Sequence, residues 1–142
     1  KFTLLIRSYE EGTPHFEEME KLTDFLIKSW KSIGVELKIE AVNEDEFKQQ
    51  LQAKKYDMVL AGQGLGYNFD TYAYWHSSQT TDTGLNLSNY KSFAANQLIE
   101  EIRDTFDSKE KDKKLKDLAK ILAKDIPAIF LYRPRYTFVT DG

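Results

Sequence analysis

The stretch "VELKIEAVNEDEFKQQLQAKKYDMVLAG", from Val35 to Gly62, predicts a strand, a helix and a second strand in succession. Its first eight residues alternate apolar and polar side chains, as in a strand that buries one face. Asn43, with Glu46 three residues later, gives the capping-box pattern that opens a helix, and this helix is expected to end near Lys55. The short apolar run from Tyr56 to Ala61 then predicts the next strand.

The residues before this stretch predict the same alternation. The apolar run from Phe2 to Arg7 suits a central strand covered on both faces. Thr13 can cap a helix that has Pro14 in its first position, and Gly34 stands where a left-handed cap is expected. Between them, apolar residues recur every three or four positions, at Met19, Leu22, Leu26, Trp30 and Ile33. Strand-helix-strand-helix-strand implies parallel strands joined by right-handed crossovers.

Two further helices are expected after the polar loop that follows Trp75. Their inward faces are Leu98, Ile99, Ile102 and Phe106 in the first, and Leu115, Leu118, Ile121 and Leu122 in the second. The mixed-charge run "DSKEKDKK" between them is interpreted as a solvated turn and first helical turn. Pro127 should end the second helix, and "AIFLYRPRYTFVT" predicts a long strand interrupted at Pro134.

Composition narrows the class of protein. The 142 residues fit one domain, and 30% charged side chains predict a well-solvated surface. The net charge of -3 and the lack of an evident basic stripe argue against nucleic acid or an anionic membrane as partner. Without cysteine, disulfides and thiolate chemistry are excluded. The chain begins and ends on strand-like runs, so its ends are expected to be cuts in a longer protein.

The segment "GQGLG" after the third predicted strand is the main candidate site. Ligands of open α/β sheets bind beyond the carboxyl ends of the strands. Glycines there either let a ligand approach the backbone or make a tight turn, and the sequence leaves both open. The spacing is not that of a dinucleotide-binding loop, so no cofactor is expected. Five aromatic residues follow, of which two or three are expected in the core and the others beside the ligand: Tyr67, Phe69, Tyr72, Tyr74 and Trp75.

Polar residues elsewhere give weaker signals. His76 lies near Asp70, Ser77 and Ser78, but no nucleophile elbow is present, so His76 is interpreted as a surface histidine. The two histidines of the chain give no metal signature, and no metal is expected. Arg133, beside Pro134, is either an anion ligand or an edge charge that discourages strand addition.

Taken together, several phrases resemble the second lobe of the extracellular solute-binding proteins, family 5, which serve ABC importers of peptides, nickel and some oligosaccharides. They are "SIGVELKIEAVNEDEFKQQLQAKKYDMVLAGQG", "YWHSSQ", "NLSNYKS" and "LIEEIRDTFDSKEKDKKLKDLAKILAKDIPAIFLYRPRYTFV", and they span nearly the whole chain in the family's order. The resemblance implies an α/β fold: a three-layer lobe of the periplasmic-binding-protein type II-like fold, with a mixed, mainly parallel sheet flanked by helices. Residues 1–142 would form a single domain, one lobe of a two-lobe receptor.

The resemblance also implies a site. In peptide-binding relatives the segment after the third strand reads glycine, tryptophan, two variable residues, an acid and tyrosine. Gly62 and Tyr67 match, whereas Gln63 replaces the tryptophan and Gly66 the acid that holds the peptide's amino terminus. The expected ligand-binding residues are Gly62, Gln63, Gly64, Leu65, Tyr67, Tyr72, Trp75, Asn86, Tyr90 and Arg133.

The function implied is the substrate-binding component of an ABC importer, which captures an oligopeptide-like solute between this lobe and a missing one. An oligosaccharide or another non-peptide solute is the alternative within the family, and a hydrolase using His76 and Asp70 is the alternative from another class. Expected partners are the ligand and the permease subunits. Nucleic acid is not expected, and membrane contact is expected only through a lipid anchor outside these residues. The expected location is periplasmic or extracellular.

Overall fold

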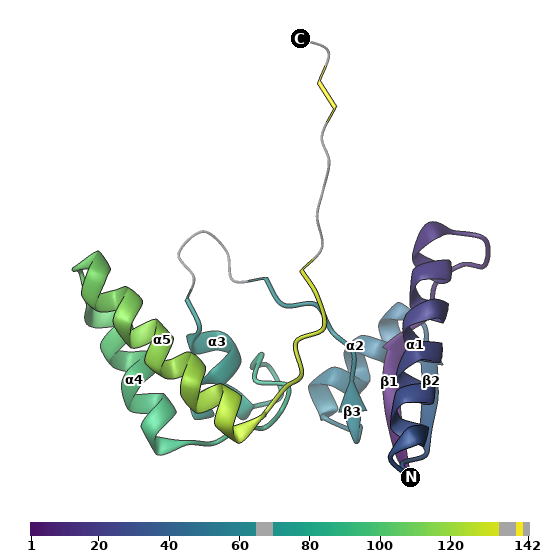
Figure 1. Cartoon of the computed structure of the whole chain (residues 1–142), viewed down its shortest axis with the longest axis horizontal. Helices are drawn as coiled ribbons and strands as arrows, with labels where there is room; N and C mark the ends of the chain where they lie inside the picture. Colours follow the sequence, from purple (N-terminus) through teal and green to yellow (C-terminus); the bar gives the residue numbers. More distant parts are fainter. Residues whose placement is uncertain (65–69, 134–138, 141–142) are drawn as a thin grey trace.

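Three parallel strands form the sheet of this protein in a computed structural model, which describes residues 1–64, 70–133 and 139–140. The strands are β1 (Phe2–Arg7), β2 (Leu37–Val42) and β3 (Met58–Val59), in the order β2-β1-β3 (Figure 1). β1 pairs with β2 along its whole length, from Phe2 opposite Leu37 to Arg7 opposite Val42. The predictions of an α/β fold, a central first strand and an outer second strand are therefore confirmed.

The third strand is shorter than its apolar run predicts. β3 pairs with β1 only at Met58 and Val59, and one further hydrogen bond joins the Leu60 N–H to the Leu5 carbonyl. Before it, the Asp57 carboxylate accepts a hydrogen bond from the Thr3 N–H at 2.9 Å in place of a ladder contact. Periodicity reports the apolar character of a segment, whereas strand length depends on how many of its residues find a partner.

Helices α1 (Pro14–Ser32) and α2 (Glu44–Ala53) begin at their predicted caps, α1 ends just before the predicted Gly34, and α2 ends close to the expected Lys55. The Thr13 hydroxyl accepts the Phe16 N–H, and the Asn43 side chain accepts the Glu46 N–H. Gly34 has φ +79°, and the N–H groups of Gly34 and Val35 return to the carbonyls of Lys31 and Trp30. This pairing is a Schellman motif, which requires a left-handed residue at the glycine.

Helix α1 packs on the sheet to form one hydrophobic cluster. Leu4, Ile6 and Leu37 are buried there against Met19, Leu26, Ile27 and Trp30 of α1, among others. Leu5 points to the opposite face because side chains alternate along a strand, and it is buried as well. Both faces of β1 are thus covered, as the continuous apolar run predicts.

A second cluster lies among the remaining helices, at the other end of the molecule in Figure 1. These elements are α3 (Tyr72–Trp75), the 3-10 helix η1 (Ser77–Thr80), α4 (Phe93–Asp104) and α5 (Ser108–Asp125). The buried members of the cluster are Trp75, Ala95, Ile99, Ile102 and Leu118. The predicted inward faces of α4 and α5 are confirmed except at Phe106, which is 99% exposed. Phe106 lies beyond the last residue of α4, so the helical spacing no longer fixes its direction.

The prediction of a strand after α5 is wrong for the residues that the structure describes. Helix α5 ends at Asp125, just before Pro127 as expected, but residues 127–133 are not a strand. Large apolar side chains are exposed along this segment, including Ile129, Phe130 and Leu131. A strand needs a partner for its main-chain groups, and the described sheet is limited to β1, β2 and β3. Residues 134–138 of the prediction lie outside the described residues. No described helix is both long and apolar enough to cross a bilayer.

Candidate functional site

The segment Ala61–Gly64 leaves the sheet at the carboxyl end of β3 and is exposed throughout. A Cβ added to Gly62 or Gly64 would meet no atom within 4 Å, and neither residue is among the glycines with positive φ. Turn geometry therefore does not explain these two glycines within the described chain. The alternative that the sequence left open, close approach by another molecule, is the one that this geometry favours.

The main chain of this segment is also available for pairing. The N–H and C=O groups of Gly62 and Gln63 make no hydrogen bond to any residue in the described ranges. The Gly64 carbonyl, by contrast, accepts a hydrogen bond from the Tyr74 hydroxyl at 2.7 Å, which ties the segment to α3. An exposed segment with free main-chain donors and acceptors can pair with the main chain of an extended ligand. Leu65 and Tyr67 of the predicted site lie outside the described residues.

Arg7, at the carboxyl end of β1, is a residue of this edge of the sheet that the sequence did not reveal. β1 and β3 are parallel neighbours, with Leu5 opposite Val59, so the register places Arg7 near Ala61. The Arg7 guanidinium lies 3.3 Å from a Glu44 carboxylate oxygen and 5.1 Å from the centre of the Tyr9 ring. The predicted strand order could have indicated Arg7, because the carboxyl ends of adjacent parallel strands share one edge of the sheet.

Tyr72 is engaged by its neighbours in α3 and α4. Its ring stacks on His76 with centroids 4.2 Å apart, and the Arg103 guanidinium lies 4.5 Å from its centre. Its hydroxyl is 3.0 Å from that of Ser78. Trp75 is buried in the second cluster, with its ring edge-on to Tyr90 and Phe130. Of the aromatic residues expected near the ligand, Trp75 lies in the core, and Tyr72 and Tyr74 pack against it.

Asn86 is fully buried and organises the loop between η1 and α4. Its Nδ2 donates to the carbonyls of His76, at 3.2 Å, and Tyr90, at 2.8 Å. Its Oδ1 accepts from the Ser88 hydroxyl and from the Tyr90 N–H. Both donors and both acceptor positions of the amide are thus used. In this structure Asn86 shapes the loop that carries Tyr90, and its side chain does not reach the surface.

Two contacts join this loop to the sheet half of the molecule. The Lys54 ammonium donates to the Asn86 carbonyl at 2.6 Å, and the Tyr56 hydroxyl donates to the Leu87 carbonyl at 2.7 Å. Burial lowers the pKa of Lys54 and raises the pKa of Tyr56. These contacts hold the Asn86 loop against the residues that lead into β3.

The raised pKa of Tyr90 predicts that the protein loses stability at alkaline pH. The Tyr90 hydroxyl donates to Asp125 at 2.6 Å; burial, followed by this hydrogen bond, raises the pKa of Tyr90. Because the folded-state pKa lies above the unfolded value of about 10, the stabilisation is complete below that pH and is lost as the pH rises above it. We expect urea unfolding to show a falling free energy of unfolding above about pH 10 and a shallower fall in Tyr90→Phe. An unchanged slope in this variant would contradict the assignment.

The interpretation of His76 as a surface histidine is wrong: its side chain is buried at the end of α3. Nδ1 accepts the Ser78 N–H at 3.2 Å, so the ring proton lies on Nε2 and is donated to Glu100, also at 3.2 Å. Asp70 instead pairs with Arg103 at 3.6 Å and accepts the Tyr72 N–H. The His76–Asp70 pair on which a hydrolase would depend is not formed. Sequence proximity could not show burial, which depends on packing against Tyr72 and α4.

Arg133 is exposed and follows Tyr132, whose hydroxyl donates to Glu18 of α1 at 2.9 Å. This hydrogen bond, followed by burial, raises the pKa of Tyr132. The contact joins residues 114 positions apart and brings the segment before Arg133 to the sheet half of the molecule. Among the described residues, no group of three or more His, Asp or Glu side chains is placed to hold a metal ion.

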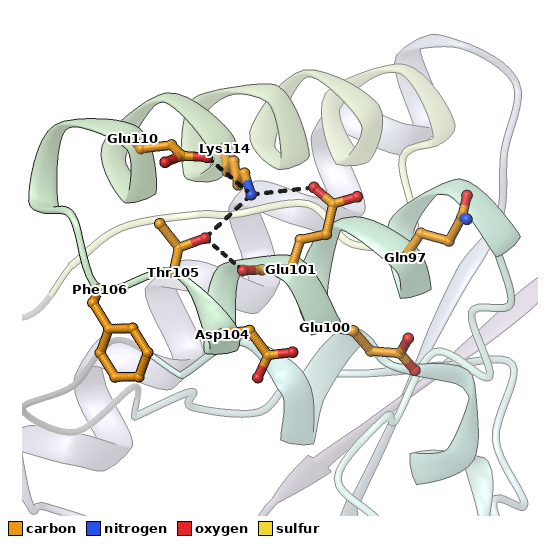
Figure 2. Close-up of a pocket in the computed structure, with 8 residues that line it drawn as sticks. All are labelled: Gln97, Glu100, Glu101, Asp104, Thr105, Phe106, Glu110 and Lys114. Atoms are coloured by element: carbon orange, nitrogen blue, oxygen red, sulfur yellow. Dashed lines mark hydrogen bonds and ion pairs between the residues drawn. The ribbon is translucent and has the colours of Figure 1, made fainter.

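A cavity of about 510 Å³ lies elsewhere, between α4 and the start of α5 (Figure 2). It is open and polar, and Lys114 points into it between Glu101 and Glu110, 3.3 Å from each carboxylate. Burial alone would lower the pKa of Lys114, but these two hydrogen bonds together raise it. The charge of Lys114 is thus satisfied within the protein. The cavity is remote from the carboxyl ends of the strands and does not include any predicted site residue.

Solved structures with the same arrangement are solute-binding proteins. The oligopeptide-binding protein AppA from Bacillus subtilis, in complex with a nonapeptide, matches with a TM-score of 0.78 and 26% sequence identity over 89% of this chain and 24% of its own. The resemblance to the family 5 solute-binding proteins is confirmed. NikZ from Campylobacter jejuni, in complex with Ni(L-His), and the peptide complex of DppA from Helicobacter pylori share the fold. Their TM-scores are 0.72 and 0.71, at 24% and 22% identity, each over 89% of this chain and 24% of theirs.

The match to these family 5 structures is confined to part of each of them. The chain spans about a quarter of the length of each of them. No family model and no curated protein sequence matches the chain. The likeness therefore rests on the three-dimensional arrangement of the helices and strands together with modest sequence identity.

Proposed function

We propose that this chain is the second, ligand-binding lobe of the substrate-binding component of an ABC importer and that it captures an oligopeptide-like solute. Residues 1–142 act as a single lobe, and the ligand lies between it and a lobe outside this sequence. The observation that carries the proposal is the exposed segment Ala61–Gly64 at the carboxyl end of β3, with unobstructed glycines and with main-chain groups of Gly62 and Gln63 that are free within the described residues. The protein acts by binding and release, without catalysis.

The contacts follow from this geometry. An extended peptide presents N–H and C=O groups at the spacing of a strand, and it can pair with Gly62, Gln63 and Gly64 as a sheet edge pairs with an added strand. Leu65 and Tyr67, which follow in the sequence, are proposed as further ligand contacts. Tyr72, Trp75, Asn86 and Tyr90 support the segment from α3 and the following loop, and Arg133 meets an anionic group of the ligand.

An oligosaccharide or another non-peptide solute is the second candidate. Gln63 and Gly66 stand where peptide-binding relatives have a tryptophan and an acid, so a charge-assisted bond to a peptide ammonium is lost. Such a bond contributes about 1.5 to 3 kcal/mol. The solved structure of MoaA from A. tumefaciens R10, in complex with mannopinic acid, shares the fold with a TM-score of 0.73, at 17% identity. A glutamine amide both donates and accepts hydrogen bonds, which suits the hydroxyl groups of a sugar.

The ligand class is tested by thermal unfolding of the full-length protein with short peptides and with oligosaccharides. A ligand present at a hundred times its Kd stabilises the folded state by about 2.7 kcal/mol. We expect stabilisation by peptides. Stabilisation by oligosaccharides alone would select the second candidate, and stabilisation by neither class would contradict both.

Gly62→Val tests the proposed contact in the same full-length protein. We expect ligand affinity to fall by about tenfold or more, because a branched side chain prevents close approach of a ligand main chain; this equals about 1.4 kcal/mol. The free energy of unfolding without ligand should change by less than about 0.5 kcal/mol, since the Cβ meets nothing within 4 Å. Titration calorimetry and urea unfolding measure the two quantities.

Gly84→Ala is the control, because the packing of its loop leaves no room for a side chain at Gly84. A Cβ there would come 2.1 Å from the Gln79 carbonyl oxygen, so the loop must shift. This variant should lose about 2 kcal/mol of stability. If Gly62→Val leaves affinity unchanged, or if it destabilises the protein as much as Gly84→Ala does, the assignment of Gly62 to the ligand site fails.

The partners and location follow from the same proposal. The receptor would deliver its ligand to the permease subunits of the importer, in the periplasm or at the outer face of the cell. A lipid anchor would lie outside these residues.

A further inference from the structure

Helix α5 carries five exposed lysines on a single face, which we call the lysine face: Lys109, Lys113, Lys116, Lys120 and Lys124. Their spacing is four, three, four and four residues, the spacing that aligns side chains along one side of a helix. Leu115, Leu118 and Leu122 of the same helix pack into the second cluster on the other side. The lysine face therefore points away from the core, along about 22 Å of helix.

The lysines of α1 are arranged differently from those of the lysine face. On α1, Lys21 and Lys28 each lie four residues after an acid and pair with it, at 4.0 Å from Glu17 and 3.9 Å from Asp24. On the lysine face, only Lys120 forms an ion pair within the described residues, with Asp117. Like charges three or four residues apart destabilise a helix slightly. Lys124, in the last turn, is favoured by the helix dipole, whereas helix stability does not account for Lys109, Lys113 and Lys116.

We propose that the lysine face of α5 docks on an anionic lipid bilayer surface. A straight row of ammonium groups matches a plane of lipid phosphates, because every lysine can reach the surface at once. The face contains no arginine, whose planar fork favours specific pockets, and no large apolar residue that would insert between acyl chains. Binding is therefore electrostatic and peripheral. This surface is separate from the proposed ligand site and does not depend on it.

Composition and the order of residues along the chain do not reveal this face. The net charge of -3 conceals it, and the run "DSKEKDKK" mixes both signs along the chain. Only the helix separates them: Glu110 turns toward Lys114 at the cavity, and the lysines of the row turn to solvent. The proposal departs from two sequence-based expectations: that an anionic membrane is not a partner, and that membrane contact occurs only through a lipid anchor.

Vesicle sedimentation with the full-length protein tests the proposal. The probes are vesicles of phosphatidylcholine alone and vesicles with roughly equal amounts of phosphatidylcholine and phosphatidylglycerol. We expect binding only to the anionic vesicles at about 0.01 M salt, and release at about 1 M salt, where screening shortens the range of the charges roughly tenfold. Absence of binding at low salt, or equal binding to neutral vesicles, would overturn the proposal. In the first case an acidic protein surface becomes the better candidate partner.

Paired variants assign the binding to α5. Each lysine near an anionic leaflet raises the partition coefficient about fivefold, so Lys113→Gln with Lys116→Gln should lower it roughly 25-fold. Glutamine keeps nearly the helix propensity of lysine, so α5 remains folded, which circular dichroism checks. The matched control is Lys21→Gln with Lys28→Gln on α1, which removes the same charge and should lower partitioning less than about threefold. Equal losses in the two pairs would show that net charge alone is responsible, and the assignment to α5 would be wrong.

Discussion

Asn86→Asp is expected to lower the free energy of unfolding by about 4 kcal/mol. The Asn86 side chain is fully buried, and its Nδ2 donates to the carbonyls of His76 and Tyr90. An ionised carboxylate cannot donate, so it would face both carbonyl oxygens as a buried charge without compensation. Urea unfolding of the wild type and the variant at neutral pH measures the difference.

Asn89→Asp is the matched control for this variant. Asn89 is exposed three residues later, and its positive φ of 52° is tolerated by asparagine and aspartate alike. We expect a change within about 0.5 kcal/mol. The loss in Asn86→Asp should also shrink as the pH falls, because burial raises the pKa of the new carboxyl group and the protonated form can donate one hydrogen bond. A pH-independent loss, or an equal loss in the control, would show that Asn86 does not hold the loop as described.

Ile99→Ala is expected to cost about 3 kcal/mol of unfolding free energy. Ile99 is fully buried in the cluster with Trp75, Ala95 and Leu118, so truncation removes apolar contacts and leaves a cavity between α3, α4 and α5. Thermal or urea unfolding measures the loss. Phe93→Ala, on the same helix but 78% exposed, should change stability by less than about 0.5 kcal/mol. Similar losses in both variants would contradict the placement of the second cluster.

Local signals predicted most of the fold. Caps such as Thr13, Asn43 and Gly34 act within three or four residues, so the sequence alone shows where α1 and α2 begin and where α1 ends. The continuous apolar run of β1 indicated a strand covered on both faces, and the structure confirms it. These predictions succeed because their physical causes lie within one helical turn or along one strand.

Features set by distant contacts could not be predicted in the same way. His76 is buried because Tyr72 stacks on it and Glu100 binds it, and the absence of a strand over residues 127–133 depends on which partners lie nearby. For the candidate site, the sequence singled out Gly62 and Gly64 but could not distinguish a tight turn from a close approach. Arg7 could be assigned to this edge of the sheet only once the strand order was known.

Hydrogen exchange of the full-length protein tests the central claim most directly. The exchange rates of the amide groups of Gly62, Gln63 and Gly64 are measured without ligand and with a saturating peptide or oligosaccharide selected by thermal stabilisation. The proposed site predicts fast exchange without ligand and marked slowing with it, because the free N–H groups would then donate to the bound solute. Unchanged exchange at these three residues, with slowing only at the cavity between α4 and α5 or elsewhere, would contradict the proposed site.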